Sequence, residues 1–246
     1  MTAAKMRLMS GLPAIKRREM TWEAPSNVPK SFDVRERWPE AGVPVRAQLD
    51  CGSCWAFATT TAASIRFNIK GHDYGILSPQ DLVSCDRYDS GCRGGGLITP
   101  HIYMEETGAT TEACMSYKSY TGRVPTCPSK CDNGSTIIRH KYENIARYTV
   151  DDVMEGLMND GPMYFVFTVY DDFAKYRSGI YQYKTGRPGD GHAVTLMGWG
   201  EENGVKYWLL QNSWGEDWGE NGFFRMRRGT NECGCEQSGF LSGYVQ

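Results

Sequence analysis

The sequence predicts an α+β fold in which a helical, cysteine-rich first half is followed by a second half made mainly of strands. Three observations support this prediction. Apolar residues recur at helical spacing after Cys54, continuous apolar runs are frequent from Met163 onward, and most of the nine cysteines lie in the first half. A chain of 246 residues can bury a substantial core in one large domain or in two smaller ones.

The helix predicted after Cys54 is the central element of the first half. Its apolar residues follow a three- and four-residue spacing, which is typical of one buried face: Trp55, Ala58, Ala62, Ile65 and Ile69. Gly71 suits the end of the helix, and Gly52 and Ser53 suit a tight turn before it. Cys54 would then lie at the helix N-terminus, where unpaired N–H groups and the helix dipole favour a thiolate.

Further elements follow from capping residues and apolar runs. Ser78-Pro-Gln-Asp81 is a capping box that starts a second helix, and a third helix is expected from Leu97 to about Thr107. A fourth is expected from Thr149 to Asn159, before Gly161-Pro162. The expected strands are Met163–Tyr170, Ile180–Tyr183, Ala193–Trp199, Tyr207–Gln211 and Phe223–Arg227.

A cysteine nucleophile at Cys54 needs a base, and the chain has four histidines: His72, His101, His140 and His192. His192 is the strongest candidate, because it lies where a glycine loop becomes an apolar strand. Asn212 ends the next strand and can orient an imidazole by accepting its N–H. Trp214, two residues later, can shield that bond from water.

These features resemble the papain family of cysteine proteases, and the cathepsin B branch most closely. The motifs that carry the resemblance span nearly the whole chain from Val28: Phe32-Asp33-x-Arg35, Cys51-Gly-Ser-Cys-Trp55, Gly91-Cys92-Arg-Gly-Gly95, Gly191-His192-Ala193, Asn212-Ser-Trp214-Gly and Trp218-Gly-Glu-Asn-Gly-Phe223. The sequence departs from the family at Leu49 and Asp50, where small residues are usual.

The resemblance implies a peptidase domain at 28–246 with a papain-like two-lobe fold. A helical lobe at about 36–136 and a β-barrel lobe at about 137–246 would enclose the active-site cleft. Residues 1–27 are polar and basic and contain no apolar core of a signal peptide. The resemblance implies that they are a truncated prosegment-like tail, and an unrelated flexible extension is the alternative. Nine cysteines indicate an oxidising compartment. The resemblance implies that this compartment is a lysosome-like vesicle or the outside of the cell.

The resemblance also implies the roles of individual residues in a cysteine endopeptidase. Cys54 would attack the peptide carbonyl as a thiolate paired with His192, Asn212 would orient His192, and Gln48 would form the oxyanion hole with the Cys54 N–H. The expected substrate-binding residues are Gly94, Gly95, Trp214, Ala193 and Ser238. Ser238 would form the floor of the pocket for the second residue before the scissile bond, although Glu236 and Gln237 are close in sequence.

The same resemblance gives the disulfides Cys51–Cys92, Cys85–Cys127 and Cys114–Cys131, and leaves the pairing of Cys233 and Cys235 open. We expect no cofactor and no metal. The expected partners are protein and peptide substrates, with cystatin-like or prosegment inhibitors possible, and the chain is expected to be a monomer. The formal net charge of −2 gives no reason to expect a nucleic acid, and no apolar run is long enough for a membrane span. Asn133-Gly-Ser135 is a glycosylation acceptor, expected in an exposed loop.

Three alternatives remain. Cys51-x-x-Cys54 has the spacing of a thiol–disulfide oxidoreductase, which would require these two cysteines to pair. The chain could also be a catalytically silent homologue, or it could ligate peptides from the same acyl-enzyme. Within peptidases, cathepsin B trims dipeptides with two adjacent histidines on a loop over its cleft. No adjacent histidine pair exists here, and His101 is the only histidine between Gly96 and Cys127, so an endopeptidase with an open cleft is predicted.

Overall fold

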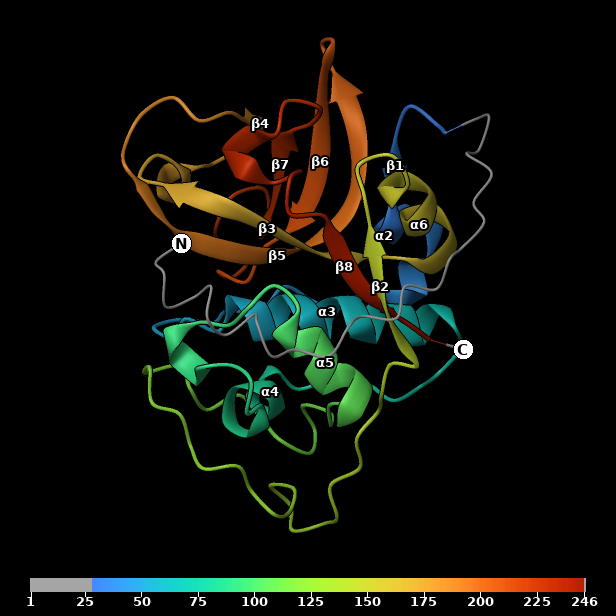
Figure 1. Ribbon diagram of the computed structural model, residues 1–246, viewed down its shortest axis with the longest axis vertical. Helices are drawn as coiled ribbons and strands as arrows, with labels where there is room; N and C mark the ends of the chain where they lie inside the picture. The colour runs from blue at the N-terminus through green and yellow to red at the C-terminus, as the bar shows by residue number, and fades with distance from the viewer. Residues whose placement is uncertain (1–27, 246) are drawn as a thin grey trace.

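The computed structural model describes residues 28–245, so the expected prosegment-like tail lies outside the described residues. Its core consists of one eight-stranded sheet and three main helices beneath it (Figure 1). We call residues 44–143 the helical half and the other described residues the sheet half. Between residues 28 and 245, no helix is long and apolar enough to cross a membrane.

Helix α3 (Cys54–Ile69) starts and ends where the sequence predicted. Residues 55–67 are all buried, because the helix lies between the sheet on one side and helices α4 and α5 on the other (Figure 1). Such a helix is apolar or small all around rather than on one face alone. Its end is marked by Gly71 with φ +83°. The helix therefore joins the two halves and carries Cys54 at their boundary.

The two smaller helices of the helical half begin in different ways. Helix α4 (Pro79–Cys85) has Ser78 as its N-cap, whose Oγ accepts the Asp81 N–H. Helix α5 (Thr99–Glu106) starts two residues later than predicted. The reason is Asp89, whose Oδ1 accepts from the Gly96 N–H at 2.7 Å and the Thr99 hydroxyl at 2.6 Å, so this carboxylate holds the preceding residues in a loop.

The sheet half contains the predicted strands and three that the sequence pattern did not reveal. The strand order is β2-β8-β3-β5-β6-β7-β4, and β1 (Phe32–Asp33) pairs with β5. The expected barrel is therefore a sheet whose edge strands are β2 and β4. The strands are β2 (Asn144–Tyr148), β3 (Met163–Tyr170), β4 (Ile180–Tyr181), β5 (Pro188–Glu202), β6 (Val205–Gln211), β7 (Phe223–Arg227) and β8 (Phe240–Tyr244). Pairing is antiparallel except between β4 and β7.

Several predicted boundaries in the sheet half need correction. Strand β5 is longer than predicted, because its first residues pair with β3 although they are glycine-rich. Helix α6 (Val153–Asp160) starts at the Asp152 cap rather than at Thr149, whose N–H and hydroxyl bond to the Asp152 carboxylate. Ala41 and Val43, placed by sequence in the helical lobe, belong to the apolar core of the sheet.

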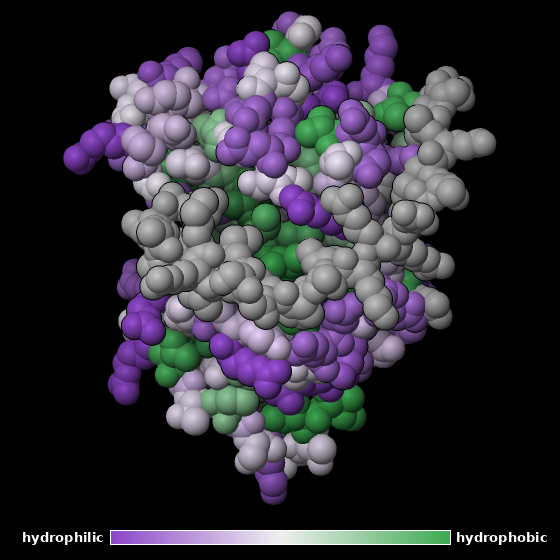
Figure 2. Space-filling model, in the orientation of Figure 1, coloured by the Kyte–Doolittle hydropathy of each residue, from purple (hydrophilic) through white to green (hydrophobic). Residues whose placement is uncertain are grey.

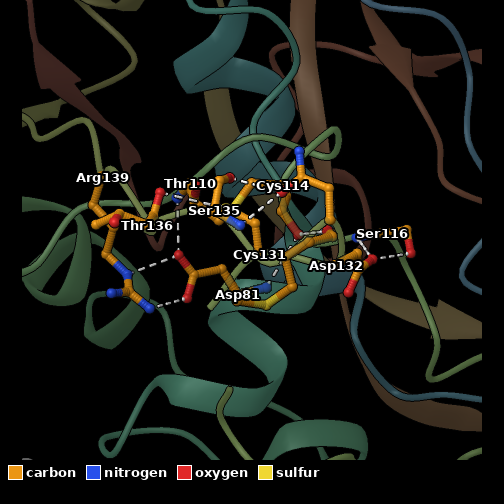
Figure 3. Close-up of a disulfide and its surroundings, with 12 residues drawn as sticks. Asp81, Thr110, Cys114, Ser116, Cys131, Asp132, Ser135, Thr136 and Arg139 are labelled. Atoms are coloured by element: carbon orange, nitrogen blue, oxygen red, sulfur yellow. Dashed lines mark hydrogen bonds and ion pairs between the residues drawn. A yellow bond between two sulfur atoms is a disulfide. The ribbon is translucent and has the colours of Figure 1, made fainter. Parts of the chain in front are cut away.

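All three disulfides predicted by resemblance are present: Cys51–Cys92, Cys85–Cys127 and Cys114–Cys131. They all lie in the helical half. Figure 3 shows Cys114–Cys131 beside an ion pair, in which the partly exposed Arg139 donates to both oxygens of the buried Asp81 at 2.8 and 2.9 Å. Asn133 lies in the exposed turn after Cys131, as expected for a glycosylation acceptor.

Candidate active site

Cys54 is the first residue of α3, and its thiol is free. The turn before it is fixed by the Cys51–Cys92 bridge and by the Gly52 N–H, which donates to the Cys92 carbonyl at 2.9 Å. A Cβ at Gly52 would lie 2.5 Å from that carbonyl oxygen, so this close approach requires glycine. The disulfide and the glycine together set the position at which the helix begins.

The sulfur of Cys54 faces strand β5. Burial raises the pKa of the Cys54 thiol, and hydrogen bonds from the backbone N–H groups of Ala193 and Trp55 lower it. The Ala193 contact places Cys54 next to the residue that follows His192. The hydroxyl of Thr195 also donates to the Ala58 carbonyl at 3.3 Å, which joins β5 to α3.

His192 is buried on β5 and held by Asn212. Its Nε2 lies 2.8 Å from the Asn212 Oδ1, and the Ser213 N–H donates to the same oxygen at 2.8 Å. An amide oxygen only accepts, so Nε2 carries the hydrogen and Nδ1 is free to accept a proton in the neutral ring. Burial lowers the pKa of His192 to about 4, although the Asn212 bond opposes this shift.

Aromatic rings cover this hydrogen bond. Trp214 packs on the His192 ring with centroids 4.8 Å apart, and Phe167 meets it edge-on at 5.7 Å. His192 is 4% exposed and Asn212 3% exposed. Excluding water strengthens the bond electrostatically and fixes the ring plane.

Gln48 is anchored at both ends of its side-chain amide. Its Oε1 accepts from the Ser213 hydroxyl at 2.7 Å, and its Nε2 donates to the Cys51 carbonyl at 2.8 Å. The nitrogen has a second N–H, which remains available to a ligand. The backbone is held as well, because the Gln48 N–H donates to the Ser213 carbonyl at 2.9 Å and the Tyr117 hydroxyl donates to the Gln48 carbonyl. Sequence reasoning missed Ser213 and Tyr117.

Burial opposes a charge on either Cys54 or His192 when each is considered alone, because a lone ion loses its hydration. A proton passing from the thiol to Nδ1 creates both charges together, and their attraction offsets the lost hydration. Proton transfer between the two residues would therefore form an ion pair at less cost than ionising either residue alone. This coupling is what a cysteine–histidine pair needs to form a nucleophile.

The expected substrate-binding residues occupy different surroundings. Gly94, with φ +104°, and exposed Gly95 follow the Cys92 turn, and a Cβ at Gly95 would lie 2.5 Å from the Trp55 ring. Ser238 is partly buried, and its carbonyl accepts from Arg147 at 3.1 Å. The nearby Glu236 carboxylate is occupied by the indole N–H of Trp208 and by two backbone N–H groups.

The other three histidines lie elsewhere. His101 is fully buried against Tyr142 and Tyr164, while His72 and His140 stack on the two faces of Tyr74. The oxidoreductase alternative is excluded by the disulfides, because Cys51 pairs with Cys92 and leaves Cys54 free.

Comparison with known proteins agrees with this geometry. A model of the papain family of cysteine proteases matches residues 28–242. A cathepsin B-like protein of Giardia intestinalis is 44% identical over 228 residues, which cover 90% of this chain and 76% of that relative. Cathepsin B of Dictyostelium discoideum is 35% identical over 225 residues, covering 84% and 72% of the two chains.

Solved structures show the same relationship. A procathepsin B from Trypanosoma congolense superposes with a TM-score of 0.87 at 30% identity, covering 96% of this chain and 84% of the other. Bromelain from Ananas comosus superposes with a TM-score of 0.75 at 29% identity, covering 89% and 100%. The family match extends over almost all of the described residues, and the chain therefore belongs to the papain family of cysteine proteases, with cathepsin B-like homologues.

Proposed function

We propose that this cysteine protease is an endopeptidase that uses Cys54 as nucleophile and His192 as base. The observation that carries the proposal is the position of the His192 ring. Its Nε2 is fixed on Asn212, which leaves Nδ1 to take the thiol proton. The next residue along β5, Ala193, lies close enough to Cys54 for its backbone N–H to lower the pKa of the thiol.

The reaction then has two halves. The Cys54 thiolate attacks the peptide carbonyl, and the resulting oxyanion accepts from the Cys54 N–H and the second N–H of Gln48. His192 gives its proton to the leaving amine, which leaves an acyl-enzyme that water hydrolyses. Ser213 contributes by holding the Gln48 amide in this orientation.

The substrate would lie along Gly94 and Gly95 as an added strand, bonded through its backbone. The pocket for the second residue before the scissile bond would favour apolar side chains, with Ser238 at its floor. The Glu236 carboxylate already accepts from the Trp208 indole and from the backbone N–H groups of Gly229 and Asn231, which supports a pocket floor without a free acidic group. Ala193 and Trp214 would flank the reacting bond.

The cleft would be open at its leaving-group side, the side that receives residues after the scissile bond. His101, the only histidine between Gly96 and Cys127, is fully buried and unable to reach a substrate carboxylate. Lys118 is engaged with Asp132, whose pKa falls to about 2 mainly because of this contact. Asp50 is exposed close to Gln48 and would repel a terminal carboxylate.

The expected setting is an oxidising compartment, a lysosome-like vesicle or the outside of the cell, where the three disulfides persist. The similarity to a procathepsin B supports a zymogen in which a prosegment covers the cleft. Cystatin-like proteins are further candidate inhibitors, and we propose a monomer.

The test is labelling with an epoxide peptide probe, followed by mapping of the labelled residue. We expect label on Cys54, loss of label and of peptide hydrolysis in Cys54→Ala, and an unchanged circular dichroism spectrum in that variant. Hydrolysis by Cys54→Ala at the wild-type rate would refute the mechanism. A folded wild-type protein that neither labels nor hydrolyses peptides would support the silent homologue.

Endopeptidase action is tested with an internally quenched peptide blocked at its C-terminus and the same peptide with a free carboxylate. Equal rates, or a faster blocked peptide, are expected. A strong preference for the free carboxylate that is lost in Lys118→Ala or Arg123→Ala would show that these residues bind the substrate terminus. Product analysis with an added amine acceptor distinguishes hydrolysis from ligation.

A further inference from the structure

We propose that Leu49 and Tyr120 form an apolar wall on the leaving-group side of the cleft and select apolar side chains just after the scissile bond. This inference rests on the proposed function, because it assigns one side of the same site. It starts from a residue whose conformation and environment are both unfavourable.

Leu49 is strained and exposed at the same time. Its φ is +51°, a left-handed conformation that a leucine side chain rarely adopts. Of the five described non-glycine residues with positive φ, three are asparagines, the type that tolerates this conformation best, and the others are Leu49 and Cys233. The Leu49 side chain is nevertheless 63% exposed. Neither feature contributes to the stability of the fold, and strain of this kind is found where a site needs a particular side chain.

Leu49 is held beside the catalytic residues rather than in a mobile loop. Its neighbour Gln48 is fixed through side chain and backbone to Ser213, Cys51 and Tyr117. On the other side, the Asp50 N–H donates to the Tyr120 carbonyl at 3.2 Å. The Leu49 side chain therefore projects from a turn whose two ends are anchored.

The position of this turn gives the side of the cleft. Ala47, two residues before Leu49, forms a β-bridge with Trp214, and Trp214 packs on His192. The leaving amine must approach His192 to receive its proton. A substrate that enters along Gly94 and Gly95 therefore leaves past Trp214 and the turn that carries Leu49.

Tyr120 extends the same surface from a second segment. Its carbonyl is bonded to Asp50, and its own side chain is 52% exposed. Both side chains are among the most exposed large hydrophobic residues described between 28 and 245. Two such residues on adjacent anchored segments form a surface that an apolar or aromatic substrate side chain can cover.

The experiment compares quenched peptides that differ only in the first two residues after the scissile bond, which are leucine in one set and serine in the other. The enzymes are wild type, Leu49→Asn and Tyr120→Ala, with Ile138→Ala as a matched control. Ile138 is an exposed aliphatic residue, 67% accessible, in the segment before Arg139. The cleavage rate of a short substrate with a small dye as leaving group reports on the catalytic residues alone, because this substrate does not reach Leu49 and Tyr120.

We expect wild type and Ile138→Ala to prefer the leucine peptides by about tenfold in kcat/KM, the size of effect that an apolar contact gives. Both wall variants should lose most of this preference and cleave the short substrate at the wild-type rate. Leu49→Asn should also melt at an equal or higher temperature, because asparagine tolerates the positive φ.

An unchanged leucine preference in both wall variants would overturn the proposal, as would a loss of preference in Ile138→Ala. A lower melting temperature in Leu49→Asn would show that Leu49 is structural instead. Failure of the proposed function would give a different result, because none of these proteins would then cleave the short substrate.

Discussion

The helical half and the sheet half use different means to hold their chain in place. Between residues 44 and 143, long loops join three helices, and three disulfides with a buried ion pair fix those loops. In the sheet half, strand pairing and a large aromatic core do this work, and its two cysteines, Cys233 and Cys235, form no disulfide. Loops lack the regular backbone hydrogen bonds that hold paired strands together, and disulfides stabilise them instead.

The candidate active site spans this difference. Cys54 and Gln48 come from the cross-linked half, and His192 and Asn212 from the sheet half. The hydrophobic surface at the middle of the face shown in Figure 2 lies between the two halves. A change confined to either half can therefore move Cys54 and His192 apart without replacing either residue. The following changes test how far each half depends on its own means of stabilisation.

The largest effect on stability is expected from Arg139→Ala. Asp81 is completely buried, so losing Arg139 removes the counter-charge of a carboxylate that keeps only the Thr110 N–H and the Tyr103 hydroxyl. This should cost about 3–5 kcal/mol of the free energy of unfolding. The measurement is urea unfolding. Arg87→Ala is the control, because the Arg87–Glu106 pair is exposed to water and its loss should change stability little. Equal losses of unfolding free energy in the two variants would show that the Arg139–Asp81 pair stabilises the fold no more than an exposed pair does.

Replacing Cys51 and Cys92 together by serine should cost roughly 2–4 kcal/mol, because the unfolded chain gains freedom when the bridge is absent. The kcat should also fall, since this bridge holds the turn that positions Cys54 and the Cys51 carbonyl that binds Gln48. Cys233→Ser in the sheet half, which breaks no bridge, should change stability by less than about 1 kcal/mol. A wild-type kcat in the double variant would show that the disulfide is not needed to position Cys54 and Gln48.

A pH-dependent effect is expected at Asp86. Burial, and then the charge of Asp89, raise the pKa of Asp86 to about 8. The folded protein then keeps a proton that the unfolded chain loses above pH 3.8, so stability falls as pH rises from about 4 to about 8. Asp86→Asn cannot ionise, and unfolding free energies at pH 5, 7 and 9 should therefore decline less in this variant. The same decline in both proteins would contradict the assignment.

The placement of residues that occur in contiguous motifs could be predicted from sequence. Cys54 starts a helix and His192 lies on a strand as predicted, and the structure joins His192 to Asn212 by a hydrogen bond. Their catalytic roles stay a prediction. Ser213 and Tyr117 were missed because their bonds to Gln48 span 165 and 69 residues and leave no local pattern.

Errors in the fold have similar causes. Strands β2 and β8 were missed because Arg147, Ser242 and Gly243 interrupt their apolar pattern. Pairing of the two with each other, and of β8 with β3, makes them strands. The start of α5 depended on the distant Asp89 carboxylate, which overrides local helix propensity. The left-handed backbone of Leu49 could not be predicted, since leucine disfavours it.

The central claim, that Cys54 is activated by His192, is tested most directly by the rate of Cys54 alkylation with iodoacetamide as a function of pH. In the wild type, His192 should keep the thiolate present well below the pH at which an ordinary thiol of pKa about 8.5 reacts. In a folded His192→Ala variant, burial without the imidazolium should move the rise in rate to alkaline pH. Identical pH profiles for the two proteins would contradict the account.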